Sequence, residues 1–282
     1  MPNPFESDMM AAGYAMARPP VHARVMERAH RALGRPAPFR RALDVGCGAG
    51  LSTRALEGFA EHSIGMEPAE PMLKWHGALA PASDFLVGHA EALPLGAGSV
   101  DLITAAGALN YTNLDLFFPE ALRTLTPAGT LLVYDFSPGR SFRHNDRLDE
   151  WFTTFTTRYP WPRHEARELN PQILASLESG CHLSGHEDFE IGITLSPAFY
   201  LEYMLTETNV ASALRSGVAY DEIRQWCAST LEPRVGRPGA RSAVPWLLRV
   251  HAPAVGLRAP GGSGKASGSG GTSRGWRRSA DR

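Results

Sequence analysis

The chain of 282 residues contains only three cysteines, and their positions exclude two common architectures. Cys47, Cys181 and Cys227 form no C-x-x-C pair, and the histidines do not repeat at metal-ligand spacing. Neither a zinc site nor a disulfide framework is indicated, so no bound metal is expected. This cysteine usage is typical of a reducing compartment, and we expect a cytoplasmic protein.

Long apolar runs are also missing. No stretch approaches the 18 residues that a membrane-spanning helix needs. The N-terminus lacks the basic and apolar regions of a secretion signal. We therefore expect no membrane partner.

Neither sign of charge is in excess, because 28 basic residues face 29 acidic ones and the formal net charge is −1. Such a chain has no global field that attracts nucleic acid, so no nucleic-acid partner is expected. The 43% hydrophobic content, in contrast, suffices for a sizeable core. The length suits one domain of about 250 residues with a tail, or a domain with a large insertion.

The segment from Arg41 to Thr53 is the most informative part of the chain. A short apolar run ends at Asp44, three alternating glycines come next, and a helix-forming stretch begins at Leu51. The pattern predicts a strand, a tight turn and a helix N-terminus, which together let the backbone approach a nucleotide-like ligand closely. Glycine accepts positive φ and has no Cβ to collide with that ligand. The three glycines are Gly46, Gly48 and Gly50.

A second short apolar run ends in Glu67, 23 residues after Asp44. An acid about 20 residues past a glycine turn is where a ribose diol is held, because a carboxylate accepts hydrogen bonds from both hydroxyls. A glycine triplet alone is equally compatible with a loop that merely turns. Two more strand-like runs, at 85–95 and 99–106, favour the ligand-binding interpretation.

With these runs in view, the chain resembles the class I S-adenosylmethionine-dependent methyltransferases, in the branch with a D-V-G-C-G-x-G motif. This branch includes the type 11 (UbiE-like) and the trans-aconitate methyltransferase-like enzymes. Four stretches carry the resemblance, in the family's order and spacing over roughly residues 5–136: 43–50, 65–73, 88–95 and 122–135. A nicotinamide-dependent dehydrogenase is less favoured, because in G-x-G-x-x-G the third glycine would stand one residue later.

The resemblance implies an α/β fold: a Rossmann-like seven-stranded, mostly parallel sheet with helices on both faces, plus an α-helical cover. It also implies S-adenosyl-L-methionine as the cofactor. The glycine turn would pass under the methionyl part, Asp44 would order the turn, and Glu67 would bind the ribose. For Asp44 a plain helix-capping role is the alternative, and for Glu67 a surface position at a strand end.

Other contacts are implied by the same resemblance. Met72 and Leu93 would form apolar walls of the adenine slot, although Met72 also suits an ordinary helix core. His89, where the family usually has an acid, would face the adenine or solvent. The residues expected at the cofactor are Tyr14, Asp44, Gly46, Cys47, Gly48, Gly50, Glu67, Met72, His89, the N–H of Ala90 and the carbonyl of Ala106.

The methyl acceptor is constrained by the residues that come after the fourth strand. The segment 106–111 lacks the N/D-P-P-Y signature, which argues against amino groups on bases or side-chain amides. Several small-molecule relatives carry histidine where this chain has Asn110, so a general-base histidine is absent there. We therefore predict a small-molecule acceptor that ionises by itself, methylated at oxygen or carbon and positioned by Tyr111 and Arg18. Tyr14 and Arg18 would otherwise pack the first helix.

The chain divides into five segments by pattern. An N-terminal lid and first helix (1–40) precede the cofactor-binding core (41–136) and an aromatic insertion that covers the substrate (137–187). The C-terminal part of the core (188–255) is expected to contain a sixth strand at 189–195, helices at 197–216 and 219–231, and a last strand at 243–250. Residues 256–282 form a Gly-, Ser- and Arg-rich tail, expected to be disordered.

Two further expectations concern the whole protein. It should act as a monomer or a homodimer. The second functional hypothesis is a catalytically inactive cofactor-binding protein whose tail recruits a partner.

Overall fold

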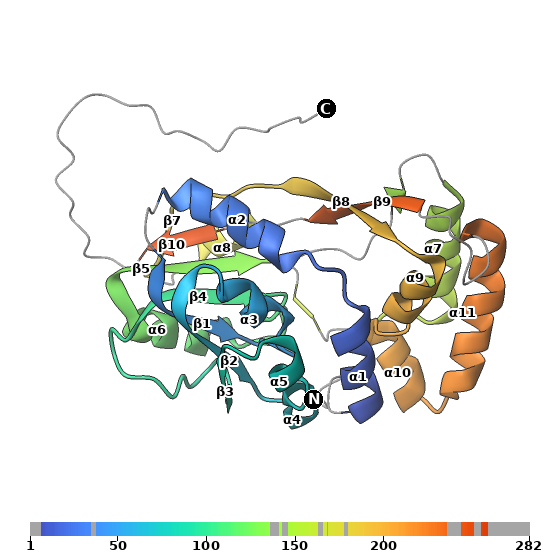
Figure 1. The fold of residues 1–282 in the computed structure, drawn as a ribbon, viewed down its shortest axis with the longest axis horizontal. Coiled ribbons are helices and arrows are strands. Elements are labelled where there is room, and N and C mark those ends of the chain that lie inside the picture. Colours follow the sequence, from blue (N-terminus) through green and yellow to red (C-terminus); the bar gives the residue numbers. More distant parts are fainter. Residues whose placement is uncertain are drawn as a thin grey trace.

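The computed structural model describes residues 7–34, 38–135, 141–142, 146–162, 166–167, 169–177, 180–235, 244–250 and 255–258 (Figure 1). The helices are α1 (Asp8–Ala17), α2 (His22–Leu33), α3 (Leu51–Leu56), α4 (Glu70–Leu73), α5 (His76–Leu79), η1 (Leu109–Tyr111, a 3-10 helix), α6 (Leu114–Thr124), α7 (Asp146–Arg158), α8 (Pro171–Ser176), α9 (Pro197–Met204), α10 (Thr208–Arg215) and α11 (Tyr220–Val235). The strands are β1 (Phe39–Val45), β2 (Ala60–Glu67), β3 (Asp84–Val87), β4 (Val100–Ala106), β5 (Leu125–Tyr134), β6 (Ser141–Phe142), β7 (His182–Leu183), β8 (Phe189–Leu195), β9 (Val244–Val250) and β10 (Val255–Arg258).

The main sheet has the strand order β3-β2-β1-β4-β5-β10-β7. The first five strands are parallel, as the alternation of strands and helices predicts. β10 and β7 continue the sheet antiparallel beyond β5. The prediction of a Rossmann-like parallel sheet with helices is thus confirmed. The parallel part, however, has five strands and not the expected seven.

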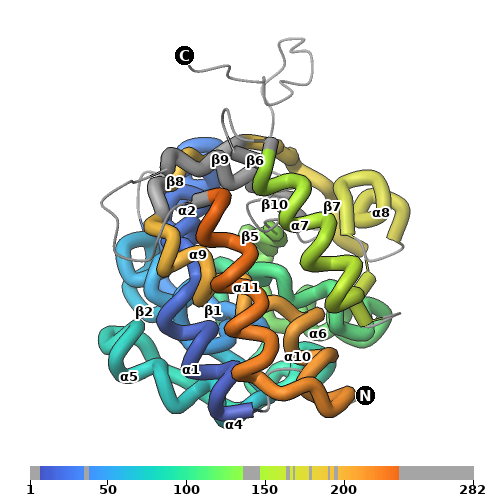
Figure 2. The backbone as a smooth tube through the Cα atoms, turned by 90° about the vertical axis from the view of Figure 1, so that its right-hand side faces the viewer, coloured from blue at the N-terminus to red at the C-terminus, as the bar shows by residue number. Residues whose placement is uncertain are grey.

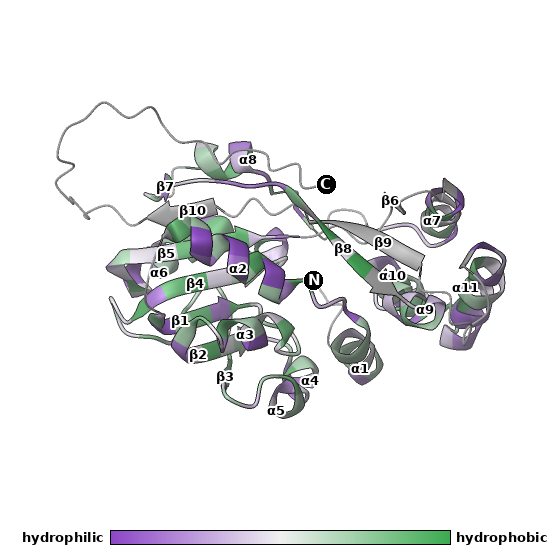
Figure 3. Ribbon diagram, turned by 45° about the horizontal axis from the view of Figure 1, so that its top comes forward, coloured by the Kyte–Doolittle hydropathy of each residue, from purple (hydrophilic) through white to green (hydrophobic). Residues whose placement is uncertain are grey.

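Both faces of the parallel sheet are covered. On one face, Phe117 and Phe118 of α6 and Leu174 of α8 pack on Leu43, Ile103 and other sheet residues. On the other face, Val25 and Met26 of α2 and Leu56 of α3 pack on Ala42 and Leu132. Figure 3 shows apolar stretches in the strands and hydrophilic residues along α2, which lies on one face of the sheet. This burial on both faces explains the apolar runs in β4 and at the end of β5.

The strand expected at 189–195 has the predicted bounds but the wrong partners. As β8 it pairs antiparallel with β9, which also pairs with β6, in a separate three-stranded sheet. The position beside β5 is taken by β10, where Val255 faces Val133. Alternating apolar residues identify a strand, but its partner depends on contacts far away in sequence.

A second apolar core lies within the helices α7, α9, α10 and α11, to the right in Figure 1. Trp151, Phe155, Tyr200 and Ile223 are buried there. Trp151 stacks on Phe155 with ring centroids 5.1 Å apart. The helix expected at 197–216 is divided into α9 and α10, so the expected cover comprises four helices drawn from both sides of β8.

α1 lies between the parallel sheet and this helical unit, beside α4 and α9 (Figures 1 and 2). Its residues Ala11 and Ala15 pack with Ala49 of the glycine turn and Met72 of α4. Small side chains let the helix approach the turn closely. The lid expected from the sequence therefore lies directly on the glycine turn.

His22 at the start of α2 predicts a pH-dependent stability. Its Nδ1 lies 2.8 Å from the Tyr134 hydroxyl, and burial lowers its pKa from 6.5 to about 4, with Arg18 adding to this effect. The unfolded chain takes up the proton near pH 6.5, whereas the folded protein resists it. Stability is therefore complete above pH 6.5 and is lost as pH falls through the folded pKa. We expect a loss of about 2 kcal/mol in unfolding free energy between about pH 7.5 and pH 5.

Urea titrations at the two pH values measure this loss. His22→Gln is expected to flatten it, while His62→Gln, at an exposed position on β2, should retain it. An equal slope in His22→Gln and the unchanged protein would contradict the assignment.

The C-terminal boundary gives a second prediction. The tail expected to begin at 256 starts later, since Val255–Arg258 pair with both β5 and β7, and residues 259–282 lie outside the described residues. A chain ended after residue 258 should keep its melting temperature, because the removed sequence is rich in glycine and serine. A chain ended after residue 254 should melt lower, because β5 and β7 lose their shared partner. Equal melting temperatures for the two truncations would show that β10 contributes nothing.

Candidate functional site

The glycine turn joins β1 to α3 in the predicted form. Gly46, Gly48 and Gly50 have φ values of 68°, 56° and 100°, all in the left-handed region that favours glycine. The N–H groups of Gly46 and Cys47 both donate to the carbonyl of Met66 on β2, at 2.8 and 3.0 Å. The turn is therefore fixed to the end of the neighbouring strand.

The buried side chain of Asp44 fixes the turn through hydrogen bonds. Its carboxylate accepts hydrogen bonds from Ser52 (2.5 Å) and Thr53 (2.7 Å) in α3 and from Thr104 (2.8 Å) in β4. Burial raises the pKa of Asp44, and the three hydroxyls oppose that rise. These contacts match the turn-ordering role. The water-mediated contact with the cofactor amino group stays a prediction.

Glu67, at the end of β2, connects the turn to the next loop. One carboxylate oxygen accepts from the Gly48 N–H and the other from the Ala69 N–H, each at 3.0 Å. Burial raises the pKa of Glu67, while these two N–H groups oppose the rise. Each oxygen keeps a further lone pair after one hydrogen bond, so the fixed carboxylate is able to accept from a diol.

The space above Gly48 is narrow. A Cβ added there would lie 3.0 Å from Met72 Cε and 3.6 Å from Tyr14 Cε1. At Gly46 an added Cβ would lie 2.4 Å from the Cβ of Ala108, which follows β4. Only glycine allows these close approaches, which place Tyr14 and Met72 at the turn; their contacts with the cofactor stay predictions.

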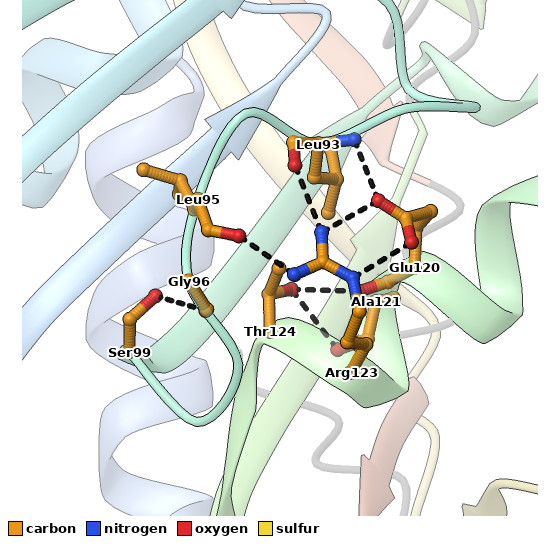
Figure 4. Close-up of polar contacts among 8 residues, drawn as sticks. All are labelled: Leu93, Leu95, Gly96, Ser99, Glu120, Ala121, Arg123 and Thr124. Atoms are coloured by element: carbon orange, nitrogen blue, oxygen red, sulfur yellow. Dashed lines mark hydrogen bonds and ion pairs between the residues drawn. The ribbon is translucent and has the colours of Figure 1, made fainter.

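The residues expected around the adenine lie on the same edge of the sheet. Met72, Ala90 and Leu93 are buried, and His89 is exposed. Arg123 of α6 donates to the carbonyls of Leu93 and Leu95, and its partner Glu120 accepts from the Leu93 N–H (Figure 4). This arginine of the fourth motif thus holds the loop that follows β3. The adenine contacts of His89 and Ala90 stay predictions.

Arg18 has a different environment from the one expected. Its guanidinium lies 3.2 Å from Glu207, donates to the Thr206 carbonyl at 2.9 Å, and stacks 4.3 Å from the centre of the Tyr14 ring. Burial opposes its charge, but Glu207 and the neighbouring tyrosines raise the pKa of Arg18 above its ordinary value. Two of its donor groups already have partners. The expectation that Arg18 offers a donor fork to the acceptor does not fit this geometry.

The carboxyl ends of β4 and β5 bring together Asn110, Tyr111 and Asp135. Asn110 Nδ2 donates to Asp135 at 3.1 Å, and Tyr111 on η1 is 46% exposed. Burial, with Asp135 next in effect, raises the pKa of Tyr111 to about 12, so its hydroxyl stays protonated and acts as a donor. Ala106 ends β4 as predicted, and its contact with the cofactor stays a prediction.

Sequence reasoning missed Asp135 as a site residue. The signal was present, because this acid comes directly after the last residue of a buried strand, as Asp44 and Glu67 lie at the ends of theirs. Parallel strands place such acids on one edge of the sheet. Glu207, 189 residues from Arg18, carried no comparable signal.

Within the part of the chain that the structure describes, no helix is both long and apolar enough to cross a membrane. Among the same residues, no group of three or more His, Cys, Asp or Glu side chains is arranged to hold a metal ion.

Comparison with known proteins gives one family match, to the methyltransferase domain over residues 43–133. An uncharacterized methyltransferase of Mycobacterium tuberculosis is 37% identical over 97 residues, 34% of this chain and 40% of that protein. A demethylmenaquinone methyltransferase of Renibacterium salmoninarum is 33% identical over 101 residues, covering 36% and 43%. The ubiquinone/menaquinone biosynthesis C-methyltransferase of Methylobacterium nodulans is 38% identical over 112 residues, covering 36% and 44%. The chain thus spans less than half the length of these relatives.

Among solved structures, a chain from Anaeromyxobacter dehalogenans described as a type II methyltransferase superposes with a TM-score of 0.58 at 23% identity, covering 82% of this chain and 95% of that one. A methyltransferase structure from Bacillus halodurans gives a TM-score of 0.51 at 18% identity, covering 84% and 99%. These likenesses establish the fold. The family match shows a methyltransferase domain over residues 43–133.

Proposed function

We propose that this chain, whose residues 43–133 form a methyltransferase domain, transfers a methyl group from S-adenosyl-L-methionine to a small-molecule acceptor in the cytoplasm. The observation that carries the proposal is the hydrogen bond from the Gly48 N–H to the Glu67 carboxylate. It joins the glycine turn to the acid expected at the ribose. The acceptor atom is oxygen or carbon, and carbon is included because one relative is a C-methyltransferase.

The residues present fit this cofactor. Glu67 offers fixed carboxylate oxygens to a diol, Met72 and Leu93 offer apolar walls to a flat base, and the backbone of the turn has no Cβ at three positions. When bound, the cofactor supplies an activated methyl group on a sulfonium. The chain then has to bind, align and exclude water, since methyl transfer is an in-line displacement. Tyr14 and the rest of α1, which lie on the turn, provide the exclusion.

Isothermal titration of the purified protein with S-adenosylhomocysteine and with NADH tests the cofactor. We expect binding of the first and none of the second. The reverse result would favour the dehydrogenase alternative and contradict the proposal.

Turnover separates an enzyme from a binding protein without activity. The protein is incubated with S-adenosylmethionine and a cell extract, and formation of S-adenosylhomocysteine is followed. We expect formation that requires both protein and extract. Tight binding without formation would favour the second hypothesis, a cofactor-binding protein.

A further inference from the structure

The acceptor side of the site can be located from the order of contacts along the sheet edge. Gly46 of the turn lies against Ala108, since an added Cβ would approach its Cβ to 2.4 Å. Gly107, one residue earlier, lies against Asp135, since an added Cβ would stand 3.2 Å from Asp135 Oδ1. The Gly107 N–H also donates to the Tyr134 carbonyl at 2.8 Å. Asp135 is therefore next to the segment that touches the turn, on the side away from Glu67.

This placement sets the direction of a bound cofactor. Its ribose is assigned to Glu67 at the end of β2 and its methionyl part to the turn after β1, so the ligand runs along the edge toward β4 and β5. Neighbouring strands lie about 4.8 Å apart, so Asp135, at the end of β5, lies beyond the methionyl end of the ligand. Tyr111, on the same side, stays protonated, as its raised pKa indicates.

The charged side chains around Asp135 disfavour the acceptor predicted from the sequence, which would ionise by itself and carry a negative charge. Asp135 and Glu207 are both acids, and Arg18 already lies 3.2 Å from Glu207. Burial raises the pKa of Tyr14, Arg18 opposes that rise, and the acids Glu67, Glu207 and Asp135 add to it. A carboxylate acceptor would meet the like charge of Asp135, while the charge of Arg18 is directed at Glu207.

We infer that the acceptor is a hydroxyl compound that enters with its proton in place, and that Asp135, held by Asn110, receives this proton. The inference rests on the proposed function. As the acceptor O–H bond breaks, its proton moves to the Asp135 carboxylate and the oxygen pair forms the O–CH3 bond. The C–S bond breaks with its electrons left on sulfur, so charge and atoms balance. Asn110 acts as a positioning residue, because its amide donates to the carboxylate and fixes its orientation.

Binding of sinefungin tests the position of Asp135 without a known acceptor. This analogue carries a protonated amine where the cofactor carries its methyl group, whereas S-adenosylhomocysteine has nothing there. A carboxylate at the acceptor position should make sinefungin bind at least tenfold more tightly than S-adenosylhomocysteine, because hydrogen bonds to charged partners are strong. Asp135→Asn should weaken sinefungin about ten- to a hundredfold and change S-adenosylhomocysteine by less than about threefold. The control, Asp115→Asn on the exposed surface of α6, removes the same charge and should leave both affinities unchanged.

Four outcomes overturn the inference. Equal losses of both ligands in Asp135→Asn would place the carboxylate on the methionyl group, and no loss of either would remove it from the site. If the unchanged protein binds neither ligand, the proposed function itself fails. If both ligands bind and only the preference for sinefungin is absent, the failure belongs to the inference alone.

The product gives an independent test. Methyl-labelled S-adenosylmethionine is supplied with a metabolite extract, and the product is treated with mild alkali. A methyl ester releases labelled methanol, whereas an ether and a C-methyl compound keep the label, and hydriodic acid then releases it from the ether alone. We expect label that survives alkali and that falls at least tenfold in Asp135→Asn at saturating cofactor. Released methanol, or full turnover in this variant, would overturn the inference.

Discussion

Replacing Glu67 by alanine is expected to weaken S-adenosylhomocysteine binding about ten- to a hundredfold. Hydrogen bonds to a charged group contribute roughly 1.5–3 kcal/mol, and the variant removes the carboxylate assigned to the ribose. It also leaves the Gly48 and Ala69 N–H groups without their acceptor, so the turn loses its anchor on β2. Calorimetric titration measures the loss. Glu61→Ala, exposed on the same strand, is the matched control and should bind as the unchanged protein does.

Folding of the variant has to be established separately, because Glu67 also orders the backbone. Circular dichroism and a cooperative melting transition serve for this purpose. A folded Glu67→Ala protein that binds with unchanged affinity would show that the ribose is held elsewhere.

Replacing Trp151 by alanine is expected to lower the unfolding free energy by about 3–5 kcal/mol, the usual cost of removing a fully buried tryptophan. Trp151 is 1% exposed, stacks on Phe155 and meets the edge of Tyr200. Its indole N–H donates to Thr230 on α11 at 2.8 Å. It therefore holds α7 against α9 and α11, and denaturant titration measures its contribution.

Trp151→Phe separates packing from hydrogen bonding. This variant keeps an aromatic ring but loses the donor to Thr230, and we expect a smaller loss, about 1–3 kcal/mol. A loss below about 1 kcal/mol in Trp151→Ala would contradict the view that the four helices form one packed unit.

The glycine turn could be predicted from sequence because its determinants are local. Three glycines need positive φ, and the acid at the end of β2 needs only the parallel pairing of two neighbouring strands to reach Gly48. The end of α2 has a local determinant as well, since Gly34 takes the left-handed conformation with φ 61°.

The partners of Arg18 and of β8 could not be predicted for the opposite reason. Arg18 meets Thr206 and Glu207 only because the helical unit folds back on α1. β8 leaves the main sheet because β10, still further along the chain, pairs with β5. A single sequence does not show which of its distant segments come into contact, so such pairings cannot be predicted from it. Asp135 is intermediate. Its position at the end of a strand could be predicted from the sequence, whereas its neighbours in space could not.

The contact between Arg18 and residues 206–207 also bears on the order of folding during synthesis. Arg18 leaves the ribosome almost 190 residues before its partners emerge. Contacts so far apart in sequence close a large loop and form late. The parallel strands β1 to β5, all within residues 39–134, are complete much earlier. We therefore expect a nascent chain halted before residue 200 to present a folded sheet with α1 held only by its packing on the glycine turn and α4, and to be cut faster by protease ahead of residue 20. In the finished protein the same bonds should protect that segment.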